Sequence, residues 1–147
     1  MTTPIFSNRY KVYINHTDAG GIVYHANHLT FFENCRRDWL SSLGFHGYFF
    51  DENGTADSTN HKQGKIHFVV SRADLTYKLP LLVDDEIIVT VHDIIKKSAS
   101  LIITQYIYRS DEDFKQGKIA SCGIITLACV INHDSGISPH RLPLAFR

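Results

Sequence analysis

Apolar residues recur at helical spacing in one early segment of the chain, from about residue 28 to residue 43. The stripe consists of Leu29, Phe32, Trp39 and Leu43, widened by Phe31, Cys35 and Leu40. Gly44 follows as a typical helix stop, and Asn27 is a candidate cap at the start. So many large apolar groups predict a helix that other elements largely enclose.

The remaining apolar pattern is typical of β-strands. Residues 9–14 alternate, with Tyr10, Val12 and Ile14 on one side. Four further strands are predicted at residues 66–77, 86–96, 100–109 and 118–132, with turns at 79–80, 96–98, 111–113 and 134–136. Short connections favour antiparallel pairing. One strand, one apolar helix and then four strands is an α+β order, in which the sheet wraps the helix.

A polar stretch separates the helix from the second strand. Residues 51–64 are rich in turn formers and predict a loop. A tolerated surface insertion is favoured there over a functional lid.

Composition narrows the class of protein. The chain has 147 residues and a formal net charge of zero without a basic block, which argues against nucleic-acid binding. The longest apolar stretch, residues 122–131, is shorter than the ~20 residues that a bilayer requires, and the N-terminus does not resemble a secretion signal. We therefore expect one domain over residues 1–147, in the cytoplasm, with Cys35, Cys122 and Cys129 as buried free thiols.

The segment HTDAGGIVYHAN, residues 16–27, carries the candidate chemistry. Asp18 supplies a nucleophile or general base, and Gly20 and Gly21 allow a tight turn close to a ligand. The helix that follows presents unpaired N–H groups suited to an oxyanion. These features alone indicate acyl transfer or hydrolysis only weakly, because Asp and Gly are also common in purely structural turns.

Four motifs in the chain together form a more specific pattern. They are D-x-x-G-x-V-Y-H at residues 18–25, F-F-E-x-x-R at 31–36, P-x-x-x-D-D at 80–85 and R-L-P at 141–143. With them, residues 10–147 resemble the 4-hydroxybenzoyl-CoA thioesterase-like group of hotdog-fold proteins, and within it the acyl-CoA thioesterases associated with the Tol-Pal system.

This resemblance implies a fold and an assembly. The hotdog fold is a five-stranded antiparallel sheet around one long central helix. Its members pair sheets edge to edge as homodimers and often form homotetramers, with the active site at the dimer interface. The implied reaction is hydrolysis of an acyl-CoA, or an acyl carrier protein thioester, to the free acid without metal or organic cofactor.

The resemblance also assigns roles to residues. The catalytic carboxylate falls on Asp18, as nucleophile or as general base, and the backbone N–H groups near Tyr24 and His25 would polarise the thioester oxygen. The His25 side chain would orient Asp18 or contact the substrate, with a structural role in the loop left open. Substrate contacts are expected at Gly20, Gly21 and Phe32.

Two other functions remain open on the sequence. A metal enzyme would use the nitrogen and oxygen ligands of His16, Asp18, His25 and His28, although no metal-binding frame supports that set. A non-catalytic acyl-binding module could share the fold, although such a module does not need a carboxylate beside the carbonyl. On the helix, Glu33 is expected to pair with Arg36 or Arg37.

Overall fold

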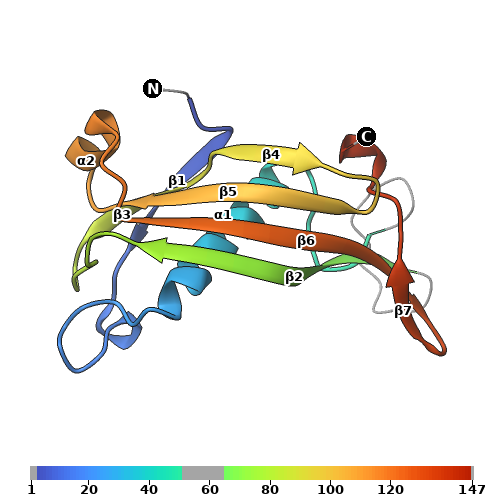
Figure 1. Cartoon of the computed structure of the whole chain (residues 1–147), viewed down its shortest axis with the longest axis horizontal. Coiled ribbons are helices and arrows are strands. Elements are labelled where there is room, and N and C mark those ends of the chain that lie inside the picture. Colours follow the sequence, from blue (N-terminus) through green and yellow to red (C-terminus); the bar gives the residue numbers. More distant parts are fainter. Residues whose placement is uncertain (1–2, 51–64, 147) are drawn as a thin grey trace.

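One antiparallel sheet covers a single long helix in the computed structural model, which describes residues 3–50 and 65–146 (Figure 1). The polar stretch at 51–64 lies outside the described residues. The sheet order is β1-β3-β5-β6-β2, with β4 beside β5 and β7 beside β6. The strands are β1 (Phe6–Lys11), β2 (Ile66–Tyr77), β3 (Glu86–Val91), β4 (Asp93–Lys96), β5 (Ser100–Tyr108), β6 (Ser121–His133) and β7 (Gly136–Pro139).

The described part of the chain therefore has seven strands where five were expected. The predicted strand at 86–96 divides at His92 into β3, which pairs with β1 and β5, and β4, which pairs with β5. The turn at 134–136 returns the chain as β7 along the end of β6. The α+β class and the sheet around one helix are confirmed, since an antiparallel path of five strands, β1-β3-β5-β6-β2, packs against α1.

Helix α1 (Asn27–Ser42) lies across one face of the sheet (Figure 1). Its buried side is formed by His28, Phe31, Phe32, Cys35, Arg36, Trp39 and Leu40. The prediction was wrong for Leu29 and Leu43, which are exposed. The buried side includes two polar residues because each has a buried partner: His28 contacts Ser121, and Arg36 donates to Gln105.

Close contact between α1 and β6 depends on a glycine. A Cβ placed on Gly123 would lie 2.9 Å from the ring of Phe32, so only glycine leaves room for that ring. Phe32 is consequently sealed in the core, with none of its surface exposed. This packing fixes α1 against the middle of the sheet.

Two predictions about the segments that follow strands need correction. Strand β1 stops at Lys11, and residues 14–16 form the 3₁₀ helix η1 (Ile14–His16), which leaves Ile14 78% exposed. The turn predicted at 111–113 is helix α2 (Asp111–Gln116), because the Ser110 hydroxyl accepts the Asp113 N–H and Gly117 ends the helix with φ 70°. A second 3₁₀ helix is η2 (Leu144–Phe146).

The remaining structural features concern the cysteines, the length of the helices and the edge of the sheet. Among the described residues the three cysteines are free, and Cys35 and Cys129 are buried as expected, but Cys122 is only partly buried. Within the same residues, every helix is too short or too polar to cross a bilayer. Strand β2 forms one edge of the sheet: beyond a bridge between Phe50 and Ile66, its outer side pairs with no described strand.

Candidate active site

The loop between β1 and α1 is closed by its own backbone. The Asp18 N–H donates to the Ile22 carbonyl at 2.9 Å, and the Gly21 N–H donates to the Asp18 carbonyl at 3.1 Å. Gly21 has φ 79°, a left-handed conformation that a residue with a Cβ adopts at a cost. The loop therefore holds Asp18 at a defined position instead of leaving it on a free turn.

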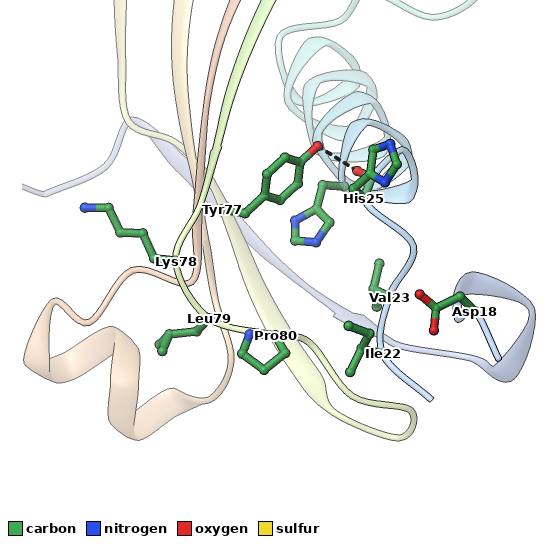
Figure 2. Close-up of a pocket in the computed structure, with 9 residues that line it drawn as sticks. Asp18, Ile22, Val23, His25, Tyr77, Lys78, Leu79 and Pro80 are labelled. Atoms are coloured by element: carbon green, nitrogen blue, oxygen red, sulfur yellow. Dashed lines mark hydrogen bonds between the residues drawn. The ribbon is translucent and has the colours of Figure 1, made fainter. Parts of the chain in front are cut away.

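The Asp18 carboxylate is anchored through one oxygen. Its Oδ1 accepts the Gly20 N–H at 2.8 Å, while Oδ2 has no hydrogen-bond partner within residues 3–50 and 65–146. In Figure 2 the carboxylate points toward Val23. One oxygen orients the group, and the other is available for chemistry.

Asp18 borders a cavity of about 340 Å³ at the start of α1. Three separate stretches of chain build it: the loop, the beginning of α1, and the turn that follows β2 (Figure 2). The lining residues are Asp18, Ile22, Val23, His25, His28, Tyr77, Lys78, Leu79 and Pro80. The expected carboxylate and the expected helix start therefore meet at one cavity, whose wall combines polar and apolar side chains.

The start of α1 offers one of the two expected backbone donors. The Tyr24 N–H is already donated to the His16 carbonyl at 3.0 Å, and the Asn27 amide donates to the same oxygen at 2.8 Å. Asn27 thus braces the loop and does not cap the helix, whose first residue follows Ala26 without a side-chain cap. In the described part of the chain the His25 N–H donates to no acceptor. His25 lines the cavity, so its N–H is a candidate oxyanion donor there.

The aromatic rings of Tyr24 and His25 lie against each other. Their ring centroids are 4.3 Å apart, and both residues are exposed. Tyr24 does not line the cavity, whereas His25 does. Among the described residues no hydrogen bond joins the His25 imidazole to Asp18, so this structure gives His25 no role in orienting the carboxylate.

The three residues expected to contact substrate are not among those that line the cavity. Gly20 and Gly21 shape the loop behind Asp18, and Phe32 is in the core against Gly123. The structure therefore gives the glycines a conformational role and Phe32 a packing role.

A second, smaller cavity of about 80 Å³ lies beside the middle of α1, where Glu33, Arg36 and Arg37 line it. The buried Arg36 donates to Gln105 Oε1 at 3.0 Å, and burial lowers the pKa of its guanidinium. The expected ion pair of Glu33 with Arg36 or Arg37 is not among the salt bridges of the described residues. Those bridges are Arg9–Asp111, Lys11–Asp84 and Arg72–Asp74.

The alternative of a metal enzyme depends on the positions of the side chains that would bind the metal. His16 Nδ1 accepts the Tyr13 N–H, and His28 Nδ1 contacts the Ser121 hydroxyl. Over residues 3–50 and 65–146, no group of three or more His, Cys, Asp or Glu side chains is gathered closely enough to hold a metal ion.

The family follows from a match over most of the chain. The profile of the thioesterase-like superfamily matches residues 12–141. The chain belongs to the thioesterase-like superfamily.

Similar proteins include curated members and solved structures. The acyl-CoA thioester hydrolase YbgC of Escherichia coli O6:H1 is 30% identical over 111 residues, covering 76% of this chain and 75% of that protein. The acyl-CoA thioesterase YbgC of Haemophilus influenzae is 31% identical over 105 residues, covering 71% and 70%. A thioesterase of Thermus thermophilus, solved with coenzyme A and Zn, has a TM-score of 0.66 at 24% identity, covering 96% of this chain and 88% of that one.

Sequence reasoning missed part of the site of this thioesterase-like protein. Tyr77 and Lys78 line the cavity from the end of β2, and the Tyr77 hydroxyl donates to the His25 carbonyl at 2.9 Å (Figure 2). His28 is 3% exposed and also borders the cavity, although the sequence suggested it only as a metal ligand. The sequence feature that could have indicated Tyr77 and Lys78 is the turn at Leu79 and Pro80. This turn follows the end of β2, where the last side chains of the strand can face the helix start.

Proposed function

We propose that this protein hydrolyses acyl-CoA thioesters to the free acid and coenzyme A. The observation that carries the proposal is that Asp18 and His25 line the same cavity, and that within residues 3–50 and 65–146 neither Asp18 Oδ2 nor the His25 N–H has a hydrogen-bond partner. A thioester carbonyl between them would meet a nucleophile or base on one side and an oxyanion donor on the other. The names of the YbgC relatives support the same reaction.

The proposed chemistry has two routes. If Asp18 is the nucleophile, its oxygen bonds to the carbonyl carbon, the C–S bond breaks, the thiolate takes a proton from water, and a second water hydrolyses the mixed anhydride. If Asp18 is the base, it accepts a proton from the attacking water and passes that proton to the leaving sulfur. Single turnover in H₂¹⁸O tests the first route: water that attacks the Asp18 carboxyl carbon of the anhydride leaves ¹⁸O in Asp18 itself, whereas the second route puts ¹⁸O only in the free acid.

His25 would stabilise the oxyanion in both routes. A backbone N–H keeps its position without a side-chain rotamer, so it is a donor that is already oriented before the reaction. Loss of one such donor typically costs about 3–4 kcal/mol of transition-state stabilisation. Because a backbone donor cannot be deleted by a simple substitution, its contribution is tested through the residues that fix the start of α1.

We propose in addition that the protein acts as a homodimer or homotetramer in the cytoplasm. The support from this chain is strand β2, a long sheet edge whose outer side is free of described partners beyond the Phe50–Ile66 bridge. Edge-to-edge pairing of two such strands would satisfy their backbone groups. Light scattering coupled to gel filtration tests this part, and a monomer at micromolar concentration would contradict it.

A thiol-release assay tests the reaction. Purified protein is offered acyl-CoA esters of graded chain length together with benzoyl-CoA and hydroxybenzoyl-CoA, and matching acyl carrier protein thioesters form a second arm. Release of thiol with a clear preference along the series supports hydrolysis, and the two arms identify the carrier. A negligible rate with every thioester, combined with measurable CoA binding, would favour the non-catalytic acyl-binding module.

A further inference from the structure

His28 occupies an unusual position for a histidine. It is the second residue of α1, it is 3% exposed, and it borders the same cavity as Asp18. Two contacts fix its ring: Nδ1 lies 2.8 Å from the Ser121 hydroxyl, and the edge-to-face contact with Tyr77 has a centroid distance of 4.8 Å. The imidazole is therefore held rigidly beside the site of chemistry.

The partner of Nδ1 determines which ring nitrogen carries the proton. Ser121 has no exposed surface, and its hydroxyl has His28 as its only side-chain or backbone hydrogen-bond partner among the described residues. If His28 Nδ1 carried the hydrogen, the buried hydroxyl proton of Ser121 would lack an acceptor, which is costly. Donation from Ser121 to Nδ1 satisfies both groups, and it places the ring hydrogen of a neutral imidazole on Nε2.

The second ring nitrogen faces open space. In the described part of the chain, Nε2 of His28 has no hydrogen-bond partner. Every buried side-chain nitrogen or oxygen in that part does have a partner, so Nε2 is not one of the buried atoms. Nε2 is therefore accessible, and the open space that His28 borders is the cavity. The hydrogen on Nε2 is available to a molecule that binds there.

The imidazole remains neutral near physiological pH. Burial, with a smaller contribution from the neighbouring His25, lowers the pKa of His28 to about 4. A neutral imidazole N–H is a recognised way to polarise a carbonyl, because it donates a hydrogen bond without bringing a buried charge.

We propose that His28 is a catalytic residue that donates its Nε2–H to the carbonyl oxygen of the bound thioester. The inference rests on the proposed thioester hydrolysis. His25 lies just before α1, His28 is the second residue of α1, and both line the same cavity, where one bound oxygen would accept from the two of them. The oxyanion would then have two donors, one from the backbone and one from a side chain that Ser121 orients.

Three variants separate catalysis from structure. In H28Q an amide N–H replaces the ring donor, in H28L no donor remains, and in the double variant H28L/S121A the partner hydroxyl is removed as well. We expect H28L and the double variant to lose about 100-fold to 1000-fold in kcat, with KM changed by less than about threefold. H28Q should recover part of that loss. The matched control is H46Q, a substitution at an exposed histidine away from the cavity.

A measurement on the unaltered protein keeps the test independent of folding. Long-range ¹H–¹⁵N correlation spectra distinguish the two neutral tautomers of an imidazole, and we expect the Nε2–H form for His28. The Nδ1–H form would overturn the proposal, as would a folded H28L protein with kcat within threefold of the parent. If the parent protein itself releases no thiol, the proposed function fails; if the parent is active and H28L is equally active, only the role of His28 fails.

Discussion

The hydroxyl of Tyr77 donates a hydrogen bond to the carbonyl oxygen of His25 at 2.9 Å. Tyr77 is the last residue of the edge strand β2, and His25 lies just before α1. The same tyrosine ring also supports His28 from its edge. One side chain therefore ties the sheet to the start of the helix at the point where the proposed oxyanion donors lie.

Removal of that hydroxyl should weaken both stability and activity. We expect Y77F to lower the free energy of unfolding by about 1 kcal/mol, the usual net value of one hydrogen bond, and to lower kcat several-fold with little change in KM. Urea denaturation and steady-state kinetics measure the two effects. Y106F is the matched control, since Tyr106 lies on β5 outside the cavity. Equal losses in both variants would contradict the special role of Tyr77.

Asp18 should be essential for turnover and dispensable for folding. In D18N the amide oxygen can still accept the Gly20 N–H, so we expect the loop to persist, while kcat falls by at least about 100-fold because the nucleophile or base is lost. The assay is thiol release, with thermal unfolding as the check on the fold. D134N, in the turn between β6 and β7, should behave like the parent protein. A fully active D18N protein would show that another group attacks or activates water.

The effect of a substitution at Gly21 should depend on how readily the new residue adopts a left-handed backbone conformation. Its φ of 79° predicts that G21A destabilises the protein by about 1–2 kcal/mol and reduces activity by displacing Asp18. Asn adopts this conformation more readily, so G21N should retain more of both properties. Unfolding and kinetic measurements on the two variants check the order, and an Ala variant equal to Asn would refute it.

His28 should make stability depend on pH in a defined window. The ordinary histidine pKa is about 6.5 in the unfolded chain, whereas burial lowers it to about 4 in the folded protein. Between these values the unfolded state binds more protons, so this contribution is complete above pH 6.5 and is lost as the pH falls toward 4. The loss should amount to on the order of 3 kcal/mol and should be absent in H28Q. Chemical denaturation of both proteins across this range measures the difference.

Gln105 should contribute strongly to the stability of the core. Its side chain accepts from Arg36 and donates to the Phe32 carbonyl at 3.1 Å, so Q105L would leave a buried cation and a buried carbonyl without these bonds. We expect a loss of about 2–4 kcal/mol in the free energy of unfolding. Q116L, at an exposed position of α2, should change it by less than about 0.5 kcal/mol. Similar values for the two variants would mean that Arg36 finds another acceptor.

The order of the main helix and strands could be predicted from the sequence because apolar residues recur within each segment at the spacing of one type of element. Strand β2 begins and ends at the residues predicted for it, and α1 begins one residue before the predicted helix and ends one residue before its end. The side of α1 that is buried was harder to predict, because His28 and Arg36 take places that hydropathy assigns to Leu29 and Leu43. Their burial depends on Ser121 and Gln105, which are distant in the sequence.

The candidate site was predictable only where its residues are contiguous. Asp18 and the start of α1 belong to one motif, and the structure places Asp18 and His25 at one cavity. Tyr77 and Lys78 come from the far end of another strand, and no local pattern in the chain connects them with Asp18. The use of the Tyr24 N–H by His16 is likewise a tertiary detail that spacing does not reveal.

The cavity wall includes apolar side chains beside Asp18 and His25. Ile22, Leu79 and Pro80 contribute apolar surface and carry no side-chain hydrogen bond. Directed evolution for a new acyl preference can therefore start at Leu79, which belongs to neither the Asp18 loop nor the helix start, whereas the Ile22 carbonyl accepts the Asp18 N–H. Selectivity and turnover would then be separately adjustable properties of the same small enzyme.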